Sequence, residues 1–311
     1  MSTAITARPT PSLLAWALLI LLGIIWGSSF MLTNIAVREF PPMTLAALRL
    51  ALAAVLIGAV AVGAGARLPR SNRLWAFALA SAIIGNVLPF WLISWSQQHI
   101  PSALSGLLMA PMPLISLLLA HFLVAGERMN LPRVIGFCAG FAGIVVLIGP
   151  GALALIGGGG GFAQLGQLAS LGAMLGYAIN GIVIKRAAAP DALGISVAIL
   201  ALSALIAAPL AFALETPNLA AVSLEGWGTM IALGIGATAM GQILLMKIIA
   251  LAGPPFLASV NYQVPLWATV FGVALLGEAL DPAFWIALAL ILAGLAIAQL
   301  GGRLSGRRGR V

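Results

Sequence analysis

Two stretches of this sequence, PLISLLLAHFLVAGE at residues 113–127 and PLWATVFGVALLGE at residues 265–278, follow the same pattern. Each begins with proline, continues as an apolar run and ends in Gly-Glu, and the second starts about 150 residues after the first. The match extends outward, because Trp26 and Tyr177 occupy corresponding apolar runs at a similar separation. The spacing predicts that the second half of the chain repeats the first.

The composition places the chain in a membrane. Of its 311 residues, 62% are hydrophobic and only 7% are charged, and the mean hydropathy is +1.14. Soluble proteins carry roughly a quarter charged residues, so this chain has too few charges to cover a water-soluble surface. The net charge of +8 comes from basic residues that stand singly between apolar runs and in one tail, which does not indicate a nucleic-acid surface. The single cysteine, Cys138, allows neither an internal disulfide nor a cysteine metal cluster.

The apolar runs are long enough to cross a bilayer. A spanning helix needs about 20 predominantly apolar residues, and ten stretches separated by Pro, Gly and charged residues fit this length. The first stretch is too long for a signal peptide and lacks a cleavage pattern, so we expect it to be retained. The predicted spans are residues 13–37, 43–65, 74–98, 102–124, 132–149, 164–185, 193–214, 226–251, 255–276 and 282–300.

Basic residues test the number of spans. With the N-terminus in the cytoplasm, only Arg38 and Arg49 of the 15 Lys and Arg residues lie towards the outer side. Cytoplasmic loops carry such an excess of positive charge, so the pattern predicts that both termini are cytoplasmic. The residues on or near the predicted cytoplasmic side are Arg8, Arg67, Arg70, Arg73, Arg128, Arg133, Lys185, Arg186, Lys247, Arg303, Arg307, Arg308 and Arg310.

Ten spans divide into two groups of five. Residues 1–150 are predicted to form the first five-helix repeat, 151–162 a glycine-rich linker, 163–302 the second repeat and 303–311 a basic cytoplasmic tail. Because five is odd, the second repeat crosses the membrane in the opposite direction. The predicted fold is an all-α polytopic membrane protein with ten transmembrane helices, arranged as two inverted five-helix repeats around a central cavity. Many secondary transporters are built in this way.

Together these features resemble the drug/metabolite transporter superfamily, in its ten-span EamA branch. The resemblance is carried by Trp26-Gly27-Ser28-Ser29-Phe30 in the first span, Arg49 in the second and the two repeated stretches described above. Within the branch, the chain is similar to YddG-type amino-acid exporters. The resemblance implies export of small metabolites, often amino acids, across a bacterial inner membrane. It also implies that spans three, four, eight and nine surround the cavity, that the first and sixth gate it, and that the fifth and tenth lie outermost.

Polar side chains inside a membrane are costly and tend to face a path or a partner helix. In the ninth span, Asn261, Tyr262 and Gln263 form the densest polar cluster and precede Pro265. Proline removes a backbone donor, so we expect a broken helix at this point with the cluster facing a polar solute. The alternative is that these side chains only bond to neighbouring helices.

Further candidates for the substrate path lie in four other spans. Trp91, Trp95 and Gln98 recur at three- and four-residue steps and should share one helix face, although tryptophan near a helix end also serves as an interfacial anchor. Lys247 either extends to the interface or attracts a carboxylate. The other path candidates are Trp26, Asn34, Asn86, Tyr177, Asn180 and Gln242, and Pro111 and Pro113 are expected to shape the fourth span as Pro265 does the ninth.

Arg49 lies about two turns into the second span. We expect its side chain to extend to the outer interface, with an ion pair to Glu39 as the alternative. Glu127 and Glu278 end corresponding spans, and we expect them to cap loops rather than to act as a pair. Gly23-x-x-x-Gly27 is one of several small-residue patterns that allow helices to approach closely within one subunit.

The sequence carries no motif for enzyme chemistry or ATP use. There is no Walker A sequence, no HExxH and no Cys/His spacing suited to a metal, and His99 and His121 stand alone. We therefore expect no enzyme activity, no cofactor and no bound metal.

The hypothesis is a secondary inner-membrane transporter, most simply an amino-acid exporter, that works by alternating access. Its expected partners are a small-molecule substrate and the lipid bilayer, with no nucleic acid and no obligate protein partner, so that a monomer suffices. The alternatives are a drug or toxic-cation exporter of the same superfamily, an intramembrane enzyme and a passive channel. A cation exporter needs a buried carboxylate, and no acidic residue is predicted deep in the bilayer.

Overall fold

The computed structural model of the chain describes residues 11–123, 129–149 and 161–308, with side chains described up to residue 299. Over these residues the structure is helical and contains no strand, and ten helices are long and apolar enough to cross a membrane. Each span begins and ends within about two residues of its predicted position, so the all-α, ten-span fold is confirmed. Residues 124–128 and most of the predicted linker lie outside the described residues.

Six spans are single helices and four are built from shorter helical segments. The single helices are α1 (Leu13–Ala36), α2 (Pro42–Gly63), α7 (Leu131–Ile148), α9 (Phe162–Ala187), α10 (Ala192–Leu214) and α15 (Pro282–Arg308). The third span is α3 (Asn72–Ala82), η1 (Ile83–Val87) and α4 (Leu88–Ser96), and the fourth is α5 (Ser102–Met109) and α6 (Met112–Leu123). The eighth is α11 (Leu224–Ala232), η3 (Leu233–Met240) and α12 (Gly241–Ala252), and the ninth is α13 (Pro254–Leu257) and α14 (Val260–Leu276). A short 3₁₀ turn, η2 (Leu219–Ala221), precedes the eighth.

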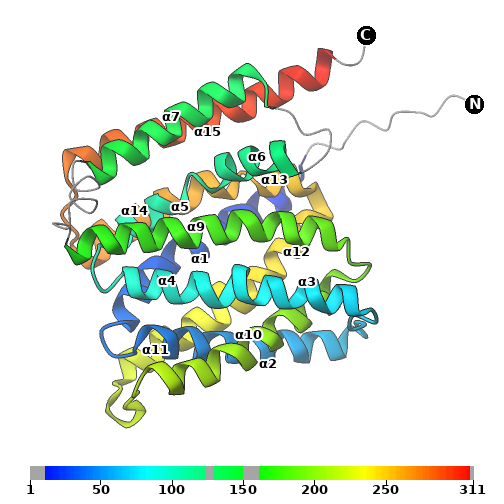
Figure 1. The fold of residues 1–311 in the computed structure, drawn as a ribbon, viewed down its shortest axis with the longest axis vertical. Helices are drawn as coiled ribbons and strands as arrows, with labels where there is room; N and C mark the ends of the chain where they lie inside the picture. Colours follow the sequence, from blue (N-terminus) through cyan, green and yellow to red (C-terminus); the bar gives the residue numbers. More distant parts are fainter. Residues whose placement is uncertain (1–10, 124–128, 150–160, 309–311) are drawn as a thin grey trace, which may run out of the picture.

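The helices are stacked so that the fifth and tenth spans lie at one edge, as the family resemblance implies. Figure 1 shows α7 and α15 running side by side at this edge, and α2 and α10 paired at the opposite edge. Between them, α1 contacts the eighth and ninth spans, while α9 contacts the third and fourth. The contacts of the first helix of one half are thus repeated by the first helix of the other. The opposite orientation of the halves across a membrane stays a prediction.

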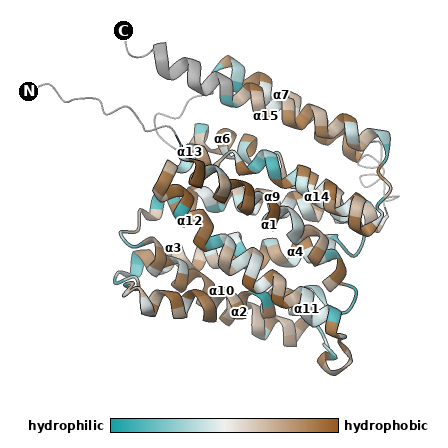
Figure 2. Cartoon of the chain, turned by 180° about the vertical axis from the view of Figure 1, so that it is seen from behind, coloured by the Kyte–Doolittle hydropathy of each residue, from teal (hydrophilic) through white to brown (hydrophobic). Residues whose placement is uncertain are grey.

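Connections between spans meet at two opposite ends of the bundle. At one end, Glu39 after α1 accepts hydrogen bonds from the Ser223 hydroxyl (2.6 Å) and backbone N–H (2.5 Å) before α11, which hold the pKa of Glu39 below its ordinary value. At the other, Asp191 before α10 accepts a hydrogen bond from the backbone N–H of Arg67 after α2 (2.8 Å). Hydrophilic residues gather at these helix ends, and the stretches between them are mainly hydrophobic (Figure 2).

One expectation about helix continuity was wrong. Helix α14 runs through Pro265, and the interruption of the ninth span lies earlier, at Ala258–Ser259. A proline removes only one backbone donor, and membrane helices tolerate this loss where neighbouring groups compensate. At the C-terminus, α15 continues to Arg308, through most of the predicted basic tail, whose cytoplasmic location stays a prediction.

Candidate functional site

The third and eighth spans contain π-helical segments at corresponding places in the two halves. These are η1, with Gly85 and Asn86, and η3, with Gly234 and Thr238. A π-helical turn disturbs the regular hydrogen-bond ladder and is frequently found at functional sites. Neither segment could be predicted from the sequence, in which only the glycines of these spans indicate an irregular backbone.

Arg49 of α2 reaches the middle of η3. Its Nε donates a hydrogen bond to the Oγ1 of Thr238 (2.7 Å), and its Cζ lies 4.1 Å from the centroid of the Phe90 ring on α4. Tyr177 on α9 lies near the guanidinium, although no hydrogen bond joins the two side chains in the described part of the chain. We call Arg49, Phe90, Tyr177 and Thr238 the Arg49 cluster. It joins spans two, three, six and eight, and therefore both halves of the chain.

The position of Arg49 differs from the prediction. Thr238 lies midway between the ends of the eighth span, and Arg49 itself stands about 10 Å along the axis of α2. The side chain therefore extends towards the centre of the bundle rather than to an interface. Glu39 is not its partner, because that carboxylate is bound to Ser223.

The guanidinium of Arg49 is incompletely compensated. Of its five N–H donors, only Nε–H has a hydrogen-bond partner among the described residues, and no carboxylate there lies within ion-pair distance. A hydrogen bond from a charged group contributes about 1.5–3 kcal/mol, and a desolvated cation–π contact about 2 kcal/mol. Removing an ion from water costs several kcal/mol even after relaxation. Arg49 is half-buried, and its terminal nitrogens are not among the fully enclosed atoms of the described residues.

Four path candidates lie beside the two π-helical segments. The Trp26 indole N–H on α1 donates to the Ala237 carbonyl oxygen in η3 (3.2 Å). Asn180 on α9 packs against Gly85 in η1, and its Oδ1 is buried without a hydrogen-bond partner in the described part of the chain. The other two candidates form hydrogen bonds to α10. The Asn86 side chain donates to the Ser203 hydroxyl (3.0 Å), and the Gln242 side chain donates to the Ser196 hydroxyl (3.1 Å).

The polar residues of the ninth span do not converge on one place. Asn261 donates its side-chain N–H to the carbonyl oxygen of Ala258 (3.0 Å), at the interruption between α13 and α14. Tyr262 packs on the core between α5 and α15. Gln263 lies over α1, so close that a Cβ on Gly23 would come within 2.7 Å of its Oε1. Consecutive helical residues point about 100° apart, and these three therefore meet different neighbours.

The remaining candidates are spread over the ends of the spans. Trp91 packs on the apolar core between α2 and α10, whereas Trp95 contacts the ring of His99 (4.6 Å between centroids), so their expected common surface is divided. Gln98 lies beyond the end of α4 and is exposed, and Lys247 is exposed on α12. The Asn34 side chain donates to the carbonyl oxygen of Gln97 (3.2 Å), while Pro111 follows the end of α5 and Pro113 lies in the first turn of α6.

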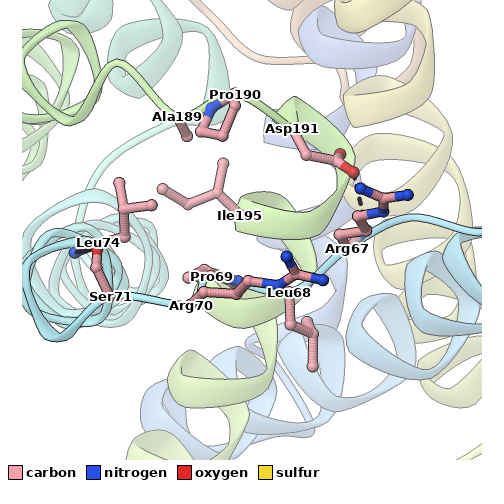
Figure 3. Close-up of a pocket in the computed structure, with 10 residues that line it drawn as sticks. All are labelled: Arg67, Leu68, Pro69, Arg70, Ser71, Leu74, Ala189, Pro190, Asp191 and Ile195. Carbon is pink, nitrogen blue, oxygen red and sulfur yellow. Dashed lines mark hydrogen bonds between the residues drawn. The ribbon is translucent and has the colours of Figure 1, made fainter.

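A pocket of about 510 Å³ opens at one end of the bundle (Figure 3). It lies between the stretch from Arg67 to Ser71 and the start of α10, and the Asp191 carboxylate borders it. None of the predicted path residues lines this pocket. It belongs to the connections between spans, whereas the Arg49 cluster lies within the spans.

Trp26→Phe is expected to lower stability by about 1 kcal/mol more than a matched Trp→Phe change elsewhere, because it also loses the hydrogen bond to Ala237. Trp16→Phe is the matched control on the same helix, since Trp16 is 47% exposed and packs edge-on against Phe256 (4.8 Å). Thermal unfolding of both variants in the same detergent measures the difference. Equal melting temperatures would show that the bond to the π-helical segment contributes nothing.

A bundle of ten membrane helices with a polar, cationic cluster between its halves defines a polytopic membrane transport protein. The sequence pattern of the EamA-like transporter family matches the chain twice, over residues 13–149 and 164–299. The chain therefore belongs to this family, within the drug/metabolite transporter superfamily. The two matches cover five spans each, in agreement with the duplication expected from the sequence.

Relatives with assigned names support the same class. The chain is 27% identical over 283 residues to the uncharacterized inner membrane transporter YedA of Escherichia coli strain K12, covering 90% of this chain and 89% of that protein. It is 28% identical over 284 residues to the aromatic amino acid exporter YddG of Ancylobacter novellus, covering 90% and 95%. Over 132 residues it is 31% identical to a probable terminal-alkyne amino-acid exporter of Streptantibioticus cattleyicolor, covering 42% and 43%.

The fold also matches a protein crystal structure with a TM-score of 0.67 at 23% identity, covering 96% of this chain and 100% of that one. This likeness supports the fold alone. Together, the family, the ten spans and the inner-membrane relatives identify a multi-pass inner-membrane transporter.

Proposed function

We propose that the protein is a secondary, non-ATP amino-acid exporter that accepts aromatic amino acids and works by alternating access between two inverted halves. Both termini are cytoplasmic in this proposal, and a monomer is sufficient. The observation that carries it is the similarity over 90% of the chain to an aromatic amino acid exporter. The Phe90 ring beside a central cation suits a solute that has an aromatic part and an anionic group.

Electrostatics disfavour the alternative of a drug or toxic-cation exporter. Such a carrier needs a carboxylate deep in the membrane, whereas the acidic residues of the described part stand in connections or in the first turn of a helix. The charge at the centre of the bundle is the positive charge of Arg49. These acidic residues are Glu39, Asp191, Glu215, Glu225, Glu278 and Asp281.

Counterflow in proteoliposomes tests the proposed function. Vesicles preloaded with one unlabelled amino acid are expected to accumulate its labelled form transiently, with aromatic amino acids giving the largest signal. Empty liposomes and an amine drug panel are the controls. The amino-acid proposal is abandoned if a wide panel gives no flux above empty liposomes, and drug flux alone favours the alternative.

A further inference from the structure

We propose that Arg49 binds the carboxylate of the transported solute through its terminal guanidinium nitrogens. The inference deepens the proposed function and rests on it, because it assigns the group of the solute that the central site recognises. The anchor comes from the second span, outside the four spans that the family resemblance places around the cavity.

The geometry leaves the bidentate edge of the guanidinium available. Thr238 takes the Nε–H and Phe90 lies under the plane, so both contacts orient the fork without using its terminal nitrogens. A planar guanidinium with free terminal donors matches a carboxylate with two parallel hydrogen bonds. An arginine inside a membrane almost always pairs with a charged side chain or with backbone carbonyls, and the described part of the chain supplies neither to the terminal nitrogens of Arg49.

The surroundings favour an aromatic amino acid over a simple anion. The Phe90 ring of span three packs against the guanidinium, and Tyr177 lies on span six near Arg49. On the same face of α9, one turn beyond Tyr177, the Oδ1 of Asn180 is an acceptor with no donor among the described residues. An ammonium group is a donor of the kind that this acceptor lacks.

A purely structural role is the competing explanation, because Arg49 also ties α2 to η3. Thr238→Val separates the two roles: it removes the hydrogen bond to Nε but keeps the charge and nearly the same shape. A structural Arg49 predicts that Thr238→Val and Arg49→Gln have similar effects. A carboxylate anchor predicts that only the loss of the charge alters selectivity.

The test is counterflow with the full-length protein and three matched solutes: L-phenylalanine, its carboxamide and phenethylamine. Wild type is expected to prefer L-phenylalanine at least about tenfold, because a site built to bind a group rejects analogues that lack it. Arg49→Gln should lower L-phenylalanine flux at least about tenfold and bring the preference close to one. Arg49→Lys and Thr238→Val should each raise the KM for L-phenylalanine but keep the preference, because the positive charge stays in place while its orientation is loosened.

Several outcomes overturn the inference. One is a wild type that moves phenethylamine or the amide as well as L-phenylalanine, and another is a folded Arg49→Gln that keeps the preference. If Arg49→Gln does not fold, the other two variants decide. Loss of the preference for L-phenylalanine in Thr238→Val or in Arg49→Lys then also overturns the inference. If wild type moves no amino acid at all, the proposed function fails, and phenylpropanoate is then tested in the same vesicles. If phenylpropanoate is transported and its flux requires Arg49, the proposed carboxylate binding by Arg49 still stands. If phenylpropanoate is not transported either, that proposal fails as well.

Discussion

Gly27→Val is expected to destabilise the protein by about 3 kcal/mol or more, which is the upper range for overpacking a close helix contact. A Cβ at position 27 of α1 would overlap the Cβ of Trp267 on α14 and come within 3.1 Å of the backbone nitrogen of Ala268. Backbone atoms cannot move aside by changing a rotamer, so the two helices have to separate. Thermal unfolding in detergent and the yield of monodisperse protein measure the effect.

Gly181→Val is the matched control for this prediction. Gly181 also lies within a membrane helix, α9, and a Cβ there would meet nothing within 4 Å. Its replacement should leave the melting temperature nearly unchanged. Similar melting temperatures for the two variants would mean that α1 and α14 do not depend on this close approach.

Helix approach through small residues is a feature that could be predicted from the sequence. The Gly23-x-x-x-Gly27 pattern on α1 faces α14, where Gln263 and Trp267 fill the space beside the two glycines. The ten spans were predictable for a similar reason, because length and hydropathy are local properties of the chain. What could not be predicted is which helix supplies the partner, because the two sides of this contact are some 240 residues apart.

The centre of the candidate site escaped prediction for two physical reasons. Arg49 was expected to reach an interface. The prediction failed because its partner, Thr238, is 189 residues away in the sequence and lies in a π-helical segment. Nothing in the hydropathy of the eighth span indicates that segment. In the ninth span, neighbouring polar residues were expected to face the same solute. Asn261 instead bonds to the Ala258 carbonyl oxygen, and Gln263 packs against Gly23 of α1. Trp26 and Asn180 were singled out as path candidates from their residue type alone, and the sequence could not show that they contact Ala237 and Gly85.

The repeated Gly-Glu stretch has a structural explanation in its second copy. Gly277 adopts φ +66° and ends α14, a conformation that glycine favours, and the backbone N–H of Glu278 then bonds back to the Gly272 carbonyl (3.1 Å). The carboxylate of Glu278 crosses Gly272 and accepts hydrogen bonds from the backbone N–H groups of Ser102 (2.6 Å) and Ala103 (2.9 Å). Glu278 was predicted to cap a loop, and in the structure it caps the N-terminus of α5 instead, whereas Glu127 lies outside the described residues.

Glu278→Gln is therefore expected to destabilise the protein by about 1–3 kcal/mol, the range for charge-assisted hydrogen bonds of a partly buried group. The carboxylate satisfies two backbone donors at the start of α5 and opposes the positive end of its dipole, and an amide replaces only part of both interactions. Denaturation in detergent, followed by a fluorescence or circular dichroism signal, measures the loss.

Glu225→Gln provides the control, because Glu225 is an exposed carboxylate in the first turn of α11. Its replacement removes the same charge without breaking a hydrogen bond between spans. If both variants lose equal stability, the effect of Glu278 is one of net charge or dipole alone. A larger loss for Glu278→Gln assigns it to the bond that joins the ninth and tenth spans to the fourth, and so explains why an acidic residue directly follows the helix-ending glycine.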